Sequence, residues 1–354
     1  MSDMSQELLE QVRQARADKA ALQIRGRGSK DFFGRPATGR TLDVAGHKGI
    51  VDYSPKELVV TVRAGTSLKA LDKALAKEGQ QLAFDPPWYE GDGSIGGSLA
   101  CNQSGPARPW SGSVRDALLG LRLISGRGEA LRFGGQVIKN VAGYDASRLQ
   151  AGALGCLGLI TELSLKVMPR PEASLYLISP QESAQAALAE MARLQRRPLP
   201  ITGLCYLQGK LHLRLAGSAA ALEDLASELG ARGYELNADE GFWQKLRDQS
   251  MAFFQGPAPL WRFSVGATTQ LAFDEECLID WGGAQRWLRG SGELEDFAAQ
   301  IPAGQGQLCQ FRGGPRDIEV FQQPSAVLKQ LHQRLKQSFD PDGLFNPGRL
   351  YGWL

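Results

Sequence analysis

The sequence predicts an α+β fold in two parts. Its 354 residues suffice for two domains, and 43% of them are hydrophobic, enough for a large core. The first half alternates short apolar runs with glycine-rich turns, whereas the second half repeats a β-α-β-β-α-β pattern twice. Strands capped by helices in this way favour a sheet with helices packed on it. We expect a first domain over residues 1–172 and a second over residues 173–315.

Composition excludes several classes of partner. The 40 basic and 38 acidic residues leave a net charge of +2 without any basic block, so nucleic acid is not expected as a partner. The five cysteines are scattered and never form a C-x-x-C pair, so we expect no iron–sulfur cluster and no metal. The N-terminal 19 residues read as a charged amphipathic helix rather than a signal peptide, and no run of about 18 apolar residues is available to span a membrane. These features predict a cytoplasmic protein with free thiols.

A glycine turn, residues 26–30, follows a predicted strand at residues 21–25. Backbone amides of such a turn can bind a pyrophosphate, and Arg25, Arg27 or Lys30 would add donors. The turn lacks the spacing of a Walker A loop. The alternative is a plain β-turn whose charges are solvated.

A second glycine-rich stretch, residues 84–116, follows a predicted strand at 58–62 and a helix at 67–77 that Ser67 would cap. Glycines let backbone N–H groups approach a flat or anionic ligand closely. Ile95 and Leu99 make the stretch too apolar for disorder. We interpret it as a cofactor-cradling loop, with an irregular surface loop as the alternative.

Residues 91–96 match the pattern G-x-G-x-x-G. In a Rossmann dinucleotide site this pattern directly follows a strand, but here Pro86 and Pro87 precede it closely. A turn leading into a short helix, residues 94–101, is therefore expected instead.

The remainder of the first domain reads as a hairpin over residues 117–133 and a glycine-spaced run that leads into a strand at 159–167. A proline-rich exit at 169–171 marks the domain boundary. In the second half, strands are expected at 175–179, 201–207, 211–216, 260–265, 277–281, 285–289 and 306–311, and helices at 181–194, 219–229, 268–273 and 293–301. Trp261, Trp281 and Trp287 fall in this part and either pack in its core or line a pocket.

Three segments in order resemble a known family. They read RGRGSK, then GSIGGSLACNQSGPARPWSGSVRDAL, then KNVAGYD with GALGCLGLITELSLKVMPRP after it. Together they resemble the PCMH-type FAD-binding domain shared by vanillyl-alcohol oxidase and the D-2-hydroxyacid dehydrogenases. With the ending FDPDGLFNPGRL, the chain is most similar to the family of E subunits of bacterial glycolate oxidase. The resemblance implies that residues 316–354 pack back on the FAD domain.

The resemblance also implies which residues bind FAD. The first turn would hold the pyrophosphate, the central loop would follow the diphosphate and the isoalloxazine ring, and residues 155–160 would contact the adenosine end. The implied contacts are Arg25, Gly26, Arg27, Gly28, Ser29, Lys30, Gly93, Ser94, Ile95, Gly96, Gly97, Ala100, Asn102, Gly105, Gly112, Asp116, Gly155, Gly158 and Ile160, with Asn346 from the tail. Because the first turn has no histidine, we expect FAD to be bound non-covalently.

Three polar residues after the central loop are the candidates for a catalytic role. Lys139, Tyr144 and Asp145 are candidates for stabilising charge on a reduced flavin or on a substrate carboxylate, the alternative being a lysine–aspartate pair across a loop. Relatives that oxidise 2-hydroxyacids carry an H-x-G-D-G-N-x-H metal motif, and the three histidines here lie outside any such motif. His212 is expected to pack within a strand, and His47 and His332 to lie at the surface.

The resemblance implies an FAD-binding subunit of a glycolate dehydrogenase complex that oxidises glycolate to glyoxylate and passes electrons to a non-oxygen acceptor. Its partners would be a second flavin subunit and an iron–sulfur subunit, with the complex in the cytoplasm or at the inner face of the cytoplasmic membrane. Whether this subunit or its sister carries out the oxidation stays open. Two alternatives are a self-sufficient flavin dehydrogenase or oxidase for another alcohol or 2-hydroxyacid, and a non-catalytic scaffold that retains the fold.

Overall fold

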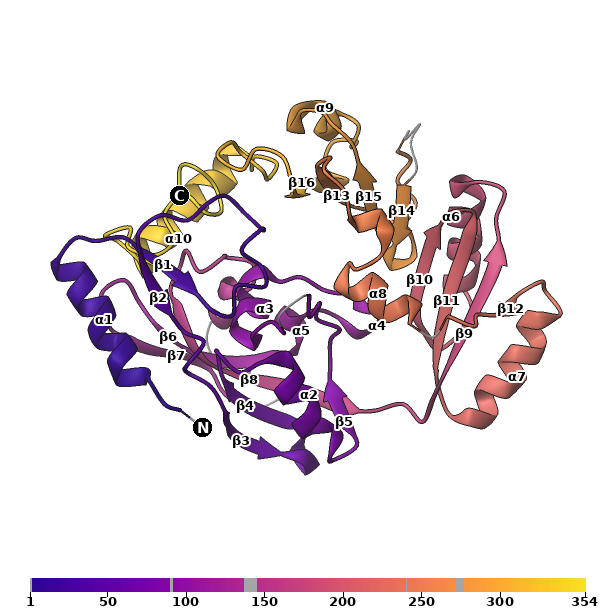
Figure 1. Ribbon diagram of the computed structural model, residues 1–354, viewed down its shortest axis with the longest axis horizontal. Coiled ribbons are helices and arrows are strands. Elements are labelled where there is room, and N and C mark those ends of the chain that lie inside the picture. Colours follow the sequence, from indigo (N-terminus) through magenta and orange to yellow (C-terminus); the bar gives the residue numbers. More distant parts are fainter. Residues whose placement is uncertain (1, 90–91, 137–144, 240, 272–276) are drawn as a thin grey trace. The chain divides into compact units, whose positions relative to one another are not determined.

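A computed structural model describes residues 2–89, 92–136, 145–239, 241–271 and 277–354 (Figure 1). The chain packs into two compact units, the first formed by Met1–Gln103, Gly112–Pro169 and Pro315–Leu354, the second by Ser104–Ser111 and Arg170–Gly314. The short segment Ser104–Ser111 differs from the predicted division, which placed the whole glycine-rich stretch in the first domain. It belongs to the second unit because Trp110 packs against that unit's core and the Gly105 carbonyl accepts a hydrogen bond from Trp281 Nε1 at 2.9 Å.

Two sheets form the frame of the first unit. A two-stranded parallel sheet pairs β1 with β2, and a larger sheet has the order β3-β4-β8-β6-β7, with β5 paired to the end of β8. The strands are β1 (Leu22–Arg25), β2 (Arg40–Asp43), β3 (Ile50–Ser54), β4 (Val59–Arg63), β5 (Gln80–Leu82), β6 (Leu118–Ile124), β7 (Ala130–Gly134) and β8 (Leu159–Pro169). The helices are α1 (Ser5–Ala17), η1 (Pro55–Glu57), α2 (Leu68–Ala76), α3 (Ile95–Cys101), α5 (Val114–Ala117), η2 (Ser147–Gln150) and α10 (Ala326–Phe339).

Helix α2 forms where the sequence predicts it. The Ser67 side chain accepts a hydrogen bond from the Ala70 N–H at 3.1 Å, which satisfies an amide of the first turn. Leu68, Leu71 and Leu75 recur on one helical face and are fully buried. Each contributes about 1.5–3 kcal/mol of hydrophobic stabilisation relative to an exposed side chain.

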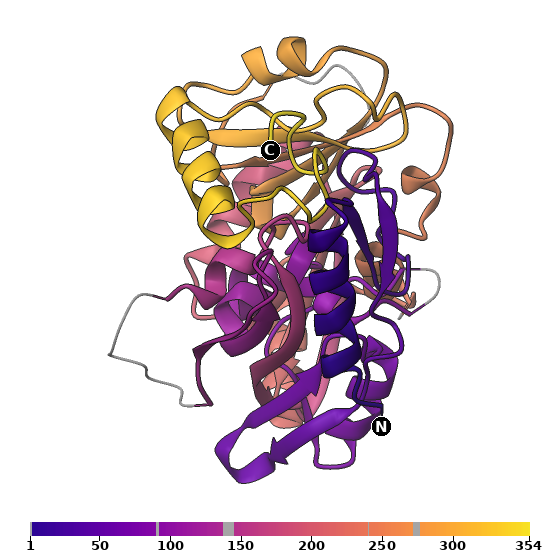
Figure 2. The same cartoon turned by 90° about the vertical axis from the view of Figure 1, so that its left-hand side faces the viewer.

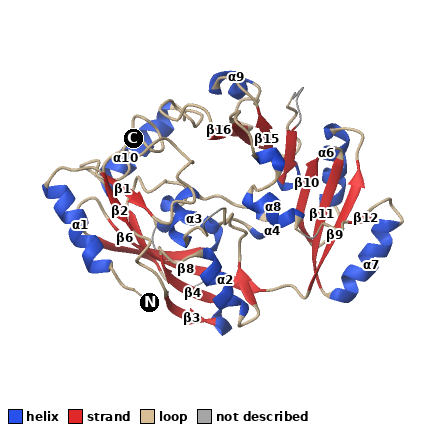
Figure 3. Ribbon diagram, viewed as in Figure 1, coloured by secondary structure: helices blue, strands red, loops and turns tan. Residues whose placement is uncertain are grey.

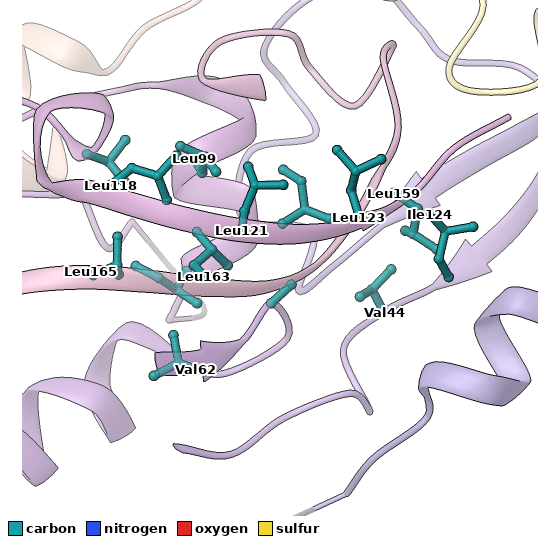
Figure 4. Close-up of a cluster of buried hydrophobic side chains, with 14 of the residues drawn as sticks. Val44, Val62, Leu99, Leu118, Leu121, Leu123, Ile124, Leu159, Leu163 and Leu165 are labelled. Atoms are coloured by element: carbon teal, nitrogen blue, oxygen red, sulfur yellow. The ribbon is translucent and has the colours of Figure 1, made fainter. Parts of the chain in front are cut away.

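The core of the first unit lies between the larger sheet and the segments that cover it. Figure 4 shows leucines of β6 and β8 alternating along their strands and meeting Leu99 of α3 and Val44. The antiparallel register places Leu121 opposite Leu163, and both side chains are buried. Helix α3 packs against this core through Ile95 and Leu99.

The second unit confirms the predicted double repeat. Its eight-stranded sheet has the order β12-β9-β11-β10-β14-β15-β13-β16 (strands labelled in Figure 1 and drawn in red in Figure 3). This order is two ferredoxin-like arrangements joined edge to edge where Tyr206 of β10 pairs with Ile279 of β14. The strands are β9 (Ala173–Pro180), β10 (Ile201–Leu207), β11 (Lys210–Gly217), β12 (Glu235–Leu236), β13 (Leu260–Val265), β14 (Cys277–Asp280), β15 (Gln285–Arg289) and β16 (Gly306–Arg312). The helices are α4 (Arg108–Ser111), α6 (Ala184–Gln195), α7 (Ala219–Gly230), α8 (Phe242–Asp248), η3 (Ala252–Phe254), η4 (Trp281–Gly283) and α9 (Leu294–Ala299).

Several details differ from the prediction. Residues 268–271 of the expected helix at 268–273 are not helical, and the rest of it lies outside the described residues. His47 is fully buried rather than at the surface, and its Nδ1 accepts a hydrogen bond from the Met4 N–H at 3.0 Å.

His212 is buried and stacks on Phe242 with ring centroids 3.7 Å apart, as a packing histidine would. Trp261, Trp281 and Trp287 are all buried in the second unit.

Candidate cofactor-binding site

A pocket in the first unit gathers four segments that are far apart in the sequence. They are the turn after β1, the helix α3, the loop that leads into β8, and the C-terminal tail. The pocket has about 730 Å³ of empty space, part of which is open to solvent. It is lined by Ile24, Arg25, Gly26, Arg27, Gly28, Ser29, Lys30, Asp31, Val44, Ala64, Ser94, Gly96, Gly97, Ala100, Cys101, Leu154, Gly155, Gly158, Ile160, Asn346 and Arg349.

The turn after β1 approaches α3 because both contacting positions are small. A Cβ atom at Gly26 would lie 2.8 Å from the Ser94 Oγ, closer than real contacts allow. Gly28 has φ +75°, a backbone conformation that other L-residues rarely adopt. Glycine at these two positions therefore allows the turn to close against the first residues of α3.

Helix α3 presents a smooth face to the pocket. Ser94 caps the helix by accepting a hydrogen bond from the Gly97 N–H at 3.2 Å. A Cβ atom at Gly96 would lie 2.7 Å from the Ala64 Cβ, so Gly96 permits α3 to pack on the end of β4. A Cβ atom at Gly97 would have the Ser94 Oγ, at 3.1 Å, as its one neighbour within 4 Å among the described residues. Gly97 therefore leaves space in the pocket, a cradle that a larger residue would fill.

The C-terminal tail, drawn in yellow in Figure 2, runs beside β1 and contributes Asn346 to the lining of the pocket. Its Oδ1 accepts a hydrogen bond from the Ile24 N–H at 2.8 Å, and its Nδ2 donates to the Leu154 carbonyl at 2.7 Å. The Asn346 N–H also donates to the Leu22 carbonyl, so the tail extends the backbone pairing beside β1. A single buried side chain thus joins β1, the loop before β8 and the tail.

The pocket is rich in positive charge. Arg25, Arg27, Lys30 and Arg349 all line it, against Asp31 as the acidic residue among the lining side chains described. Arg25 pairs with Asp31 at 3.1 Å, but both side chains are about half exposed, so the pair holds little energy. Lys30 is almost fully buried, with its Nζ 3.4 Å from the Ser29 Oγ. Backbone amides of the turn and this excess of cations suit a diphosphate.

The structure brings most of the implied FAD contacts to this one pocket. Those that line it are Arg25, Gly26, Arg27, Gly28, Ser29, Lys30, Ser94, Gly96, Gly97, Ala100, Gly155, Gly158, Ile160 and Asn346. Sequence reasoning missed Ile24, Asp31, Val44, Ala64, Cys101, Leu154 and Arg349. Arg349 directly follows the N-P-G turn of the tail, and Cys101 directly follows Ala100. These two residues could therefore have been predicted from their sequence neighbours, which are implied FAD contacts.

The other implied contacts lie outside this lining. Ile95 is buried in the core, and Asn102 ends α3 in the left-handed conformation. Gly105 belongs to the second unit. The Asp116 Oδ2 accepts hydrogen bonds from the backbone N–H and the Oγ of Ser113, each at 2.8 Å, so Asp116 stabilises a turn. Gly93, which precedes α3, and Gly112, beside Asp116, have backbone roles at these turns: the Gly93 carbonyl accepts from Leu68 N–H, and Gly112 has φ +81°.

Of the catalytic candidates, Lys139 and Tyr144 lie outside the described residues. Asp145 is described and caps the turn of η2, where its carboxylate accepts from the Arg148 N–H at 3.3 Å and pairs with the Arg148 Nε at 3.1 Å. Its side chain is half exposed and does not line the pocket. Within the described ranges, no three histidine, cysteine, aspartate or glutamate side chains are grouped so as to hold a metal ion. None of the helices described is long and apolar enough to cross a membrane.

Comparison with known proteins places the site in context. The family described as "FAD binding domain" matches residues 3–134. The chain is 49% identical over 353 residues to the glycolate oxidase subunit GlcE of Escherichia coli, covering 99% of both chains. It is also 34% identical over 139 residues to the glycolate oxidase subunit GlcD of Bacillus subtilis, where the match covers 39% of this chain and 29% of that protein.

Solved structures agree on the fold. Alkyldihydroxyacetonephosphate synthase matches 97% of this chain and 74% of its own with a TM-score of 0.69, at 15% sequence identity. At this identity the likeness concerns the fold alone.

The fold, the glycine-lined pocket and these matches define an FAD-binding oxidoreductase, which confirms FAD as the cofactor and the α+β class as the fold. More narrowly, the chain belongs to the family of the glycolate oxidase subunit GlcE. That assignment confirms the resemblance inferred from the motifs.

Proposed function

We propose that the protein is the FAD-binding subunit of a glycolate dehydrogenase complex that oxidises glycolate to glyoxylate. The full-length match to GlcE carries this proposal, because a match over 99% of both chains includes the second unit and the tail as well as the FAD domain. The cationic, glycine-lined pocket supports it independently, since its residues fit a dinucleotide diphosphate. A non-covalent mode of binding is expected because the turn after β1 offers no histidine.

The residues of the pocket would hold the cofactor in distinct ways. The turn amides with Arg27 and Lys30 would neutralise the diphosphate, and the side-chain-free face at Gly97 would accommodate the flat body of the cofactor. When bound, FAD supplies a two-electron acceptor for the hydride of an alcohol carbon. The chain's own contribution is to bind the cofactor, exclude water from the diphosphate and fix its orientation through the joined segments at Asn346.

The need to reoxidise the reduced flavin indicates which partner subunits the chain requires. Oxidation of glycolate releases two electrons and two protons, and the reduced flavin must be reoxidised by another redox centre. We propose a second flavin subunit related to GlcD and an iron–sulfur subunit as partners, with a non-oxygen acceptor beyond them. The complex would lie in the cytoplasm, with peripheral attachment to the inner face of the membrane through the partners.

Two measurements test the proposal. The purified chain should show flavin absorbance after reconstitution with FAD, and acid precipitation should leave that flavin in the supernatant. Glycolate-dependent dye reduction should require co-expression with the partner subunits. Turnover by the isolated chain would instead support a self-sufficient dehydrogenase, and a colourless protein after reconstitution would support a scaffold without a cofactor.

A further inference from the structure

The last helix, α10, leaves part of its apolar surface exposed, although Phe339 at its end packs against the core of the first unit. The structure describes all of its residues, and none of them is buried. Val327, Leu328 and Leu331 are exposed by 76%, 48% and 49%. Val327 and Leu331 lie one helical turn apart and so form a stripe on one face, with Leu328 at its edge. A helix of a folded domain ordinarily turns such a stripe to the core.

The inward face of α10 combines cationic and aromatic contacts with Phe339, whose ring centroid lies 5.9 Å from that of Phe133. Lys329 Nζ lies 4.8 Å from the ring centroid of Trp353, and the His332 ring stacks at 6.3 Å from the same indole. Lys336 Nζ donates to the Cys156 and Phe345 carbonyls at 2.8 and 2.9 Å and pairs with the buried Asp340 at 2.7 Å. These contacts at positions i, i+3 and i+7 fix the rotation of the helix, so the outward direction of the apolar stripe is determined by specific bonds.

We propose that the outward face of α10, defined by Val327, Leu328, Leu331 and Arg334, docks into an apolar groove with an acidic rim on the second flavin subunit of the complex. An amphipathic helix that offers anchors one turn apart suits recognition by a groove. This inference rests on the proposed function, because it requires that the chain is part of a complex.

Charge decides the character of the rim. The sequence of α10 contains Lys329, Arg334 and Lys336 and no acidic residue. Lys329 and Lys336 are engaged with the chain itself, so Arg334 is the cation that faces outward beside the stripe. An acidic group on the partner would therefore meet Arg334 at the border of the apolar contact.

Charge and size also argue against other occupants. Anionic lipid attracts a surface helix by about 1 kcal/mol for each free Lys or Arg, and α10 turns most of its cations inward. Val327 and Leu331 are four residues apart, so the stripe spans only about 6 Å along the helix, and its area is far below the ~800 Å² per partner of a self-sufficient interface. A symmetric pair of these faces would be too small to hold two copies together, whereas an anchor within a larger heteromeric interface fits.

The test uses the full chain co-expressed with a GlcD-type subunit of the same source, with a tag on this chain. The double variant Val327→Gln and Leu331→Gln replaces exposed apolar groups with good helix formers, so α10 should remain folded. Leu236→Gln, which changes a side chain that is 71% exposed in the second unit, is the matched control. We expect the double variant to weaken partner binding at least tenfold, Arg334→Glu to weaken it and reduce its salt dependence, and the control to bind as the wild type does.

FAD content and thermal unfolding are measured on the same samples, and both should be unchanged in every variant. Full retention of the partner by the double variant would overturn the proposal, as would a wild-type chain that fails to bind the partner. Two further results would also overturn it: stripe-dependent binding to phosphatidylglycerol vesicles, or stripe-dependent self-association in sedimentation. Absence of FAD in the wild type would refute the flavin site and not the docking face, because partner binding is scored separately.

Discussion

Gly97 offers a sharp test of the pocket because its neighbour Gly96 provides a matched comparison. The Cβ positions of the two glycines point in different directions. At Gly96 a Cβ atom would press on the backbone and side chain of Ala64 at 2.7–2.9 Å, whereas at Gly97 it would meet the Ser94 Oγ at 3.1 Å and otherwise enter the pocket. A bulky residue at Gly97 should therefore block FAD binding, whereas one at Gly96 should disturb the packing of α3.

For Gly97→Leu the free energy of unfolding of the flavin-free protein should stay within about 1 kcal/mol of the wild type, since leucine is favoured over glycine in a helix by about 0.5–1 kcal/mol. Its side chain would occupy space that the cofactor needs, and overpacking of this kind costs about 1–3 kcal/mol or more. Affinity for FAD should accordingly fall by about tenfold to 100-fold or beyond. Gly96→Ala should instead lower the stability of the flavin-free protein by about 1–3 kcal/mol.

Urea unfolding of both flavin-free variants and titration with FAD, followed by flavin fluorescence, measure the two effects. Wild-type FAD affinity in a folded Gly97→Leu protein would show that the cofactor does not lie on this face of α3. A Gly96→Ala protein as stable as the wild type would show that α3 does not depend on its close approach to Ala64.

Three further predictions concern the groups around the pocket and in the second unit. Asn346→Ala leaves the Ile24 amide and the Leu154 carbonyl without their buried partner and should cost about 2–4 kcal/mol in chemical unfolding; a loss below about 0.5 kcal/mol would contradict the joining role given to this side chain. Lys336→Met strands the buried Asp340 and should destabilise by about 3–5 kcal/mol, whereas Arg16→Ala removes an exposed partner of Asp342 and should cost less than about 1 kcal/mol. Burial lowers the pKa of His212 to about 4, with Lys210 adding to the effect and Asp239 opposing it, so the unfolded state binds more protons between pH 4 and an unfolded pKa of about 6.5. The buried neutral His212 therefore contributes to the free energy of unfolding above pH 6.5, and this contribution is lost as the pH falls toward 4. The variant His212→Leu should not lose stability over this pH range. If the variant and the wild type have the same pH dependence of stability, His212 is not its cause.

Much of this protein could be predicted from local sequence because local chemistry determines it. Ser67 and the leucines at 68, 71 and 75 define α2 through capping and periodicity, and the glycine turns identify the backbone that would approach a cofactor. The strand pattern of the second unit was readable because its strands are short apolar runs separated by turns and because α6 and α7 each bury one apolar face. The ordered motifs were sufficient to identify the family.

Tertiary structure decided what depends on segments distant in sequence. Periodicity alone does not show which side of α10 is exposed, but its contacts with Trp353, Cys156 and Asp340 leave Val327, Leu328 and Leu331 facing outward. Gly105 lies within the glycine-rich stretch, yet the indole of Trp281 holds it in the second unit. Asn346 and Arg349 reach the pocket because the tail pairs with β1, more than 300 residues earlier in the chain. Sequence by itself predicted which glycines could approach a cofactor, whereas the tertiary structure brought Gly26, Gly28, Gly96, Gly97, Gly155 and Gly158 into one pocket and left Gly105 in the second unit.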